Sequence, residues 1–115
     1  MHKIVTSKVI ITNERIEHIN KRHPGDYEKY IDYIPNILNT PDYILEDNNN
    51  NDTIFILKTF PETNNNIKIV IKLHTNNQEQ DRYNSIITFW HIRDRNYKNS
   101  LKSNKIIYNK FDNNV

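Results

Sequence analysis

The first clear pattern in the chain is a helical stripe near its start. Ile16 and Ile19 recur at the spacing of one helix face and are surrounded by polar residues. Thr12 is a suitable N-cap, because its hydroxyl can accept a hydrogen bond from a free amide of the first turn. Pro24-Gly25 cannot continue a helix. We therefore expect a helix from Thr12 to His23.

A second helix is expected over residues 26–38. Pro35 lies inside it, and because proline lacks a backbone amide hydrogen, it should kink the helix or split it in two. Thr40-Pro41 ends the helical stretch. The spacing of apolar residues predicts one buried face, formed by Tyr27, Tyr30, Ile31, Ile34, Ile37 and Leu38.

The rest of the chain has the pattern of short strands. Further strands are expected over residues 42–46, 53–60, 85–92 and 105–110, whereas the polar segment 94–103 indicates a loop or a short helix. The stretch 67–75 alternates, with Ile67, Ile69, Ile71 and Leu73 on one side and Lys68, Val70, Lys72 and His74 on the other.

Helices followed by strands predict an α+β fold with an antiparallel sheet. The two helical stripes and the isoleucine row should then pack on one another. We expect the following residues to be buried together: Ile16, Ile19, Tyr30, Ile34, Ile69, Ile71 and Leu73.

Composition narrows the class of protein. The 115 residues fit a single domain, 1–115 with a core at about 10–108. The lack of cysteine excludes disulfides, thiolate zinc sites and a cysteine nucleophile, and fits a reducing compartment. No apolar run approaches the roughly 18 residues that span a bilayer, so we expect no membrane partner. A net charge of +2 permits contact with phosphates without requiring it.

The first helix carries the most informative polar residues. His18 and Arg22 are four apart and share one face, while His23 lies at the helix end. An imidazole beside a guanidinium suits RNA cleavage, since one moves a proton and the other stabilises phosphate charge. The alternative is structural: His18 as a solvated boundary residue and His23 as a C-terminal cap.

The strands supply a second set. Lys72 and His74 lie opposite the isoleucine row, and Thr88 shares a strand face with Trp90. If the helices cover the isoleucines, the other face is open, and its cations, hydroxyl and aromatic ring can hold a phosphate and stack a base. Ordinary amphipathic strands with solvated lysines and a packed tryptophan are the alternative.

Other chemistries find little support. His18 and His23 are five apart, which is not the spacing of a helical zinc pair, and no clustered ligand spacing is present. A single glycine excludes a phosphate-binding glycine loop. We expect no metal and no cofactor.

In pattern and order, the chain resembles the phage-associated nuclease domains of the barnase–EndoU–colicin–RelE superfamily of low-GC Gram-positive bacteria. The resemblance covers about residues 10–108. It rests on four segments: Ile11–Pro24, Pro41–Asp47, Asn84–Trp90 and Lys105–Tyr108.

The resemblance implies N-terminal helices on a four- to five-stranded antiparallel sheet. It also implies a metal-independent endoribonuclease that leaves a 2′,3′-cyclic phosphate. The Thr88-Phe89-Trp90 segment is similar to the hydroxyl-x-Trp pair of tRNA-cleaving colicins. Catalytic roles then fall on His18, Arg22, His23, Lys72 and Thr88, and substrate contacts on Trp90, His74, Lys58 and Arg82.

Two functions remain open from the sequence. One is a phage or toxin effector that cleaves RNA, with tRNA as a candidate, in the bacterial cytoplasm or in the cytoplasm of a target cell, and with a cognate immunity or antitoxin protein as partner. The other is an inactive RNA- or protein-binding module on the same fold. Convergence of His18, Arg22 and Thr88 on one open surface would favour the first, and a His18 that points away from the sheet face would favour the second.

Overall fold

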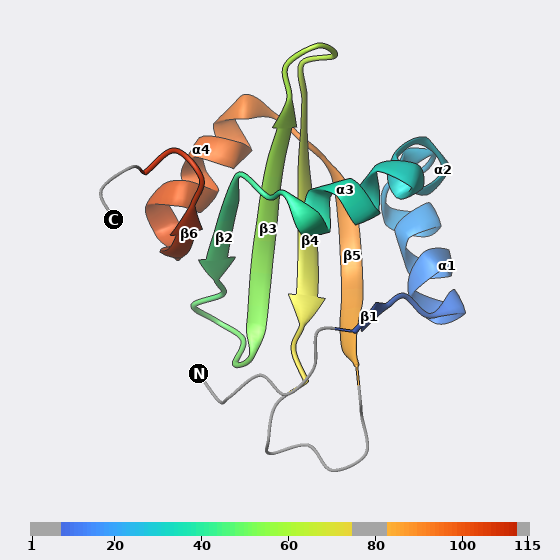
Figure 1. Cartoon of the computed structure of the whole chain (residues 1–115). Coiled ribbons are helices and arrows are strands. Elements are labelled where there is room, and N and C mark those ends of the chain that lie inside the picture. Colours follow the sequence, from blue (N-terminus) through green and yellow to red (C-terminus); the bar gives the residue numbers. More distant parts are fainter. Residues whose placement is uncertain (1–7, 75–82, 113–115) are drawn as a thin grey trace.

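The computed structural model describes residues 8–74 and 83–112. Six strands, four α-helices and one 3₁₀ helix follow one another in this part of the chain (Figure 1). In order they are β1 (Val9–Ile10), α1 (Asn13–Arg22), α2 (Asp26–Tyr30), η1 (Ile31–Tyr33, the 3₁₀ helix), α3 (Ile34–Asn39), β2 (Tyr43–Glu46), β3 (Thr53–Phe60), β4 (Asn65–Lys72), β5 (Asn84–Ile92), α4 (Asp94–Ser103) and β6 (Lys105–Asn109).

The fold is α+β, as expected, but the sheet differs from the prediction. It has six strands in the order β1-β5-β4-β3-β2-β6, not four or five. It is also not purely antiparallel, because β1 runs parallel to β5 through Val9 opposite Asn84 and Ile10 opposite Ser85. Two residues are too few for a recognisable period-two pattern, so this short edge strand was missed.

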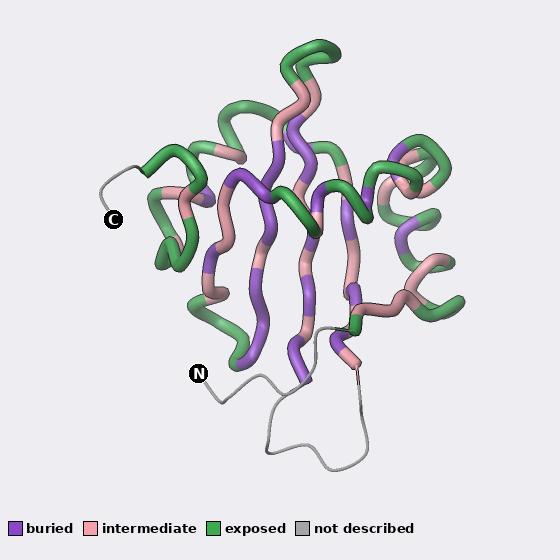
Figure 2. The backbone as a smooth tube through the Cα atoms, viewed as in Figure 1, coloured by how far each residue is buried: buried purple, intermediate pink, exposed green. Residues whose placement is uncertain are grey.

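The helices before the sheet cover one of its faces and one of its edges. In Figure 1, α3 crosses in front of the central strands, while α1 and α2 lie beside β5. The buried core between them contains Ile19, Tyr30, Ile34, Ile69, Ile71 and Leu73, as predicted. Ile16 is only half-buried. Figure 2 shows the burial concentrated along the central strands.

The first helix begins and ends close to the positions that the sequence predicts. The Thr12 hydroxyl accepts a hydrogen bond from the amide of Arg15 at 3.3 Å, and α1 ends at Arg22 with His23 as C-cap. The expected second helix is split into α2, η1 and α3. Pro35 stands in the first turn of α3, where its missing amide hydrogen has no helical partner to lose.

The polar segment after β5 forms a ten-residue helix, α4, on the opposite face of the sheet. Tyr97 and Leu101 attach it to a second, smaller core made by Leu45, Leu57 and Ile92. Burial raises the pKa of the Tyr97 phenol to about 12. The sheet therefore lies between two helical layers, one of which is a single helix.

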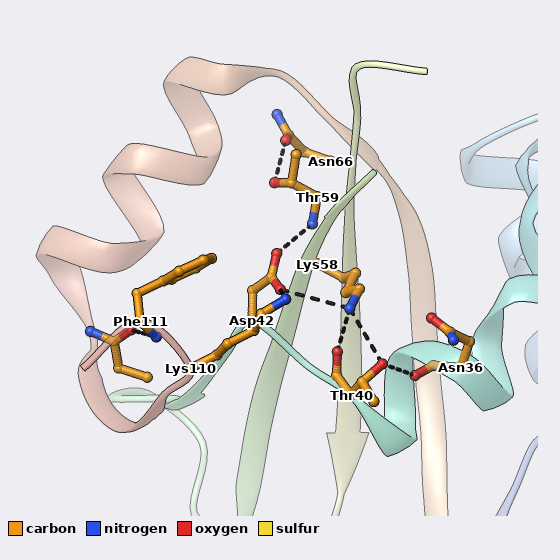
Figure 3. Close-up of polar contacts among 9 residues, drawn as sticks. Asn36, Thr40, Asp42, Lys58, Thr59, Asn66, Lys110 and Phe111 are labelled. Carbon is orange, nitrogen blue, oxygen red and sulfur yellow. Dashed lines mark hydrogen bonds and ion pairs between the residues drawn. The ribbon is translucent and has the colours of Figure 1, made fainter. Parts of the chain in front are cut away.

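A buried carboxylate, Asp42, joins three strands (Figure 3). It accepts a hydrogen bond from the amide of Thr59 at 2.9 Å and pairs with the ammonium groups of Lys58 at 3.8 Å and Lys110 at 3.2 Å. The Lys58 ammonium also donates to the carbonyl oxygen of Thr40 at 2.6 Å. The start of β2, the end of β3 and the segment after β6 thus converge on one charge.

Removing this carboxylate should strongly destabilise the fold. Asp42→Ala leaves the buried Lys58 without its counter-charge and the amide of Thr59 without an acceptor, and we expect a loss of about 3–5 kcal/mol in the free energy of unfolding. Lys110→Met is the matched control, because the Lys110 side chain is 46% exposed and such a pair contributes about 0–1 kcal/mol. Urea denaturation measures both values, and equal losses would contradict this account.

Candidate functional site

Cross-strand register decides which side chains share the α4 face of the sheet. Trp90 of β5 lies opposite Lys68 of β4, and Thr88 lies opposite Val70. The register then shifts, so that Ile71 pairs with Ile86 and Ile87 has no partner. Because of this bulge, Ile86 joins the main core while Thr88 stays on the same face as Trp90.

A histidine from the other helical layer reaches this face. The ring of His23 stacks on the indole of Trp90, with centroids 4.9 Å apart and planes within 3° of parallel. Helix α1 packs beside β5, and its C-cap residue therefore falls at the edge of the sheet. The chain leaves α1 at His23 and enters α2 after Gly25, whose φ of +87 allows this turn.

The stacked geometry leaves the chemistry of the imidazole available. Stacking uses the face of the ring, whereas the two nitrogens lie in its plane and point sideways. Within residues 8–74 and 83–112, no hydrogen bond engages a ring nitrogen of His23. The half-buried ring is therefore positioned by its contact with the indole, and its two nitrogens are available as hydrogen-bond donor and acceptor.

A half-buried lysine lies next to the indole of Trp90. The Lys68 ammonium donates a hydrogen bond to the Ser100 hydroxyl at 3.2 Å and lies 4.0 Å from the centroid of the Phe55 ring and 5.8 Å from that of Trp90. Burial lowers the pKa of Lys68, and the charge of Asp47 partly opposes this effect. The ammonium is thus a poorly hydrated cation that an incoming anion would stabilise.

The site has a pocket and a defined set of side chains. A pocket of about 320 Å³ opens between α4 and the sheet, with Lys68, Trp90 and Ser100 in its lining. Thr88 lies two positions before Trp90 on the same face of β5. An ammonium, a hydroxyl and an indole therefore line this pocket, and the imidazole of His23 lies against the same indole.

Other residues expected from the sequence lie elsewhere. His18 is exposed on α1 in a group with Glu14, Arg15 and Lys21. Lys72 shares the face of Lys68 but lies further along β4, where its ammonium donates to the carbonyl oxygen of Asn51 at 2.8 Å.

Arg22, Lys58 and His74 are also apart from the pocket lining. Arg22 is exposed in the last turn of α1. Lys58 is buried and bound to Thr40 and Asp42. His74 is buried after the end of β4, with its Nδ1 lacking a hydrogen-bond partner, and Arg82 lies outside the described residues.

Sequence reasoning missed three features of the site. Lys68 had a usable signal, because the alternation of β4 places it on the same face as Lys72. The contribution of α4, including Ser100, had none, since no local pattern shows that this segment packs over the far side of the sheet. The role of Trp90 as a platform for His23 likewise depends on a contact between distant segments.

Two features are absent from the described residues. No three His, Asp or Glu side chains come together there in a group that could hold a metal ion. No helix in this part of the chain is long and apolar enough to cross a membrane.

Comparison with known families gives the site its context. The family model described as phage-Barnase-EndoU-ColicinE5/D-RelE like nuclease3 matches residues 2–100. The chain belongs to this family. The match indicates a nuclease-type function and includes His23, Lys68, Thr88 and Trp90. No match was found among the curated proteins, and none among the solved structures.

In this nuclease, we expect the partly buried charge of Lys68 to lower the free energy of unfolding at neutral pH. Its lowered pKa means that the unfolded chain binds the proton more tightly, so the free energy of unfolding rises with pH from the folded-state pKa to about 10.5. Lys68→Met removes the charge and keeps an apolar stem on Phe55. We expect an unfolding free energy at neutral pH equal to or above that of the parent, with a weaker rise toward pH 10.5.

Chemical denaturation at a series of pH values measures this effect. Lys98→Met, an exposed lysine of α4, is the control and should stay within about 0.5 kcal/mol of the parent while keeping its pH dependence. A loss of about 1–3 kcal/mol in Lys68→Met, the cost of an unmade buried hydrogen bond, would show that the ammonium is structural.

Proposed function

We propose that this protein is a metal-independent endoribonuclease whose proton carrier is His23. The observation that carries the proposal is the His23–Trp90 stack beside Lys68, on the face that also holds Thr88. Histidine is the side chain whose ordinary pKa, near 6.5, suits proton transfer at neutral pH. A phage or toxin effector of this kind would act in the cytoplasm on RNA, with tRNA as a candidate.

The chemistry follows from the groups available. His23 in its neutral form takes the proton of a 2′-hydroxyl, and the 2′ oxygen forms a bond to phosphorus. The bond to the 5′ oxygen breaks, a proton from solvent returns to that oxygen, and a 2′,3′-cyclic phosphate remains. The Lys68 ammonium and the Thr88 hydroxyl stabilise the additional negative charge on the phosphate oxygens.

The arrangement favours His23 over His18 for this role. His18 lies among charged residues on the exposed side of α1, whereas His23 is held against Trp90 by stacking. An aromatic pair of this kind contributes about 0.5–1.5 kcal/mol beyond its area, enough to orient a side chain. Trp90 thus positions the proton carrier as well as offering its remaining surface to a base.

A second candidate function is a non-catalytic RNA-binding module. The observation in its favour is that His18 and Arg22, expected to join Thr88 on one surface, lie exposed on α1, with His18 in a separate group of charged side chains. Such a module would bind RNA through Lys68 and Trp90 and leave it intact.

Two histidine variants separate these functions. We expect His23→Ala to slow RNA cleavage by about 10²–10⁴-fold, the usual contribution of a general acid or base. His18→Ala is the matched control, because it removes the same group from the same helix, and its rate should stay within a few-fold of the parent. The assay incubates total RNA in EDTA and follows the fragments over time, after circular dichroism has shown that each variant is folded.

The outcomes are distinct. Cleavage by His23→Ala at the parental rate, or loss of cleavage in His18→Ala alone, would refute the assignment of His23. A parent that binds RNA and leaves it intact in EDTA would favour the binding module. Activity that EDTA abolishes and a divalent ion restores would contradict the metal-independent mechanism.

A further inference from the structure

The pocket beside Trp90 is formed mainly by one helix. Lys68, Trp90 and Ile92 of the sheet form one side of its lining. The other side comes from α4 and the residue that follows it, through Asn96, Asn99, Ser100, Ser103 and Asn104. Its volume of about 320 Å³ is at the lower end of the range for small-ligand sites, which suits one nucleotide and not a duplex.

The sequence of α4 places uncharged polar groups toward this pocket. Residues 96, 99, 100 and 103 recur at the spacing of one helix face, and all are asparagine or serine. The adjacent face, with Tyr97 and Leu101, attaches the helix to the small core. The basic residues Arg95, Lys98 and Lys102 do not line the pocket.

Two of these side chains have unused hydrogen-bonding capacity. The Ser100 hydroxyl accepts a hydrogen bond from the ammonium of Lys68. The side-chain amide of Asn104 donates a hydrogen bond to the carbonyl oxygen of Ser100 at 3.0 Å. Within the described residues, the side-chain amides of Asn96 and Asn99 make no hydrogen bond. Each amide offers both donors and an acceptor.

We propose that this pocket is a recognition subsite for one unpaired nucleobase of the RNA. The inference rests on the proposed function and names the part of the substrate that this site selects. Asn96 and Asn99 bind the edge of the base, because paired donors and acceptors of an amide match those of a base edge. The indole of Trp90 supplies an apolar surface, and Lys68 holds the adjoining phosphate.

The subsite requires an unpaired base for a physical reason. A base in a duplex has its pairing edge occupied and both faces stacked, whereas a base in a loop or single strand presents edge and face together. The enzyme therefore selects single-stranded or loop regions of RNA and discriminates among the four bases at the position next to the cleaved bond.

Trp90 is the only tryptophan of the chain, so its fluorescence reports directly on this pocket. The probes are the four ribonucleoside 3′-monophosphates, with ribose 5-phosphate as a control that lacks a base. We expect saturable changes with one or two of the nucleotides and at least about fivefold weaker binding in Asn96→Ala and Asn99→Ala. Asn20→Ala, an exposed asparagine of α1, should bind as the parent does.

This experiment separates the subsite from the catalytic proposal. Nucleotide binding that depends on Asn96 and Asn99 supports the subsite even if the parent cleaves no RNA. Nucleotides that bind no better than ribose phosphate, or variants that bind as well as the parent, overturn the subsite. If the parent cleaves RNA while both variants keep its cut-site preference, the subsite fails and the catalytic proposal stands.

Discussion

Burial of the isoleucines of β4 is the constraint on which the rest of the structure depends. Ile67, Ile69 and Ile71 are almost fully buried under the N-terminal helices. Since side chains of a strand alternate between its faces, this burial sets the register and directs Lys68 to the other side. A slip of one residue would bring a lysine into the core and expose the isoleucines. The packing of one face thus determines the chemistry of the other.

Features set by local patterns could be predicted from the sequence. The cap at Thr12, the break around Pro35 and the alternation of β4 all depend on neighbours within a few residues, and the structure confirms each. The short strand β1 and the helical state of α4 depend instead on partners far along the chain. A two-residue strand has no period of its own, and α4 is held through Tyr97 and Leu101 on a core that its own sequence does not reveal.

The candidate site divides in the same way. The alternation and the Thr88-Phe89-Trp90 segment correctly placed a hydroxyl and an indole on one face. Helical spacing could not decide between His18 and His23, because the choice depends on which end of α1 meets β5. The structure brings His23 onto Trp90 and leaves His18 on the exposed side. The packing of α4 partly buries the ammonium of Lys68, and this burial lowers its pKa.

The most direct test is to map the surface of the protein that binds RNA. A short RNA with 2′-O-methyl groups cannot supply the attacking hydroxyl, so it forms a stable complex for mapping by nuclear magnetic resonance. We predict that the amide signals of His23, Lys68, Thr88 and Trp90, and of residues 96–104, shift on binding. Shifts confined to the exposed side of α1 around His18, or to the α3 side of the sheet, would contradict it.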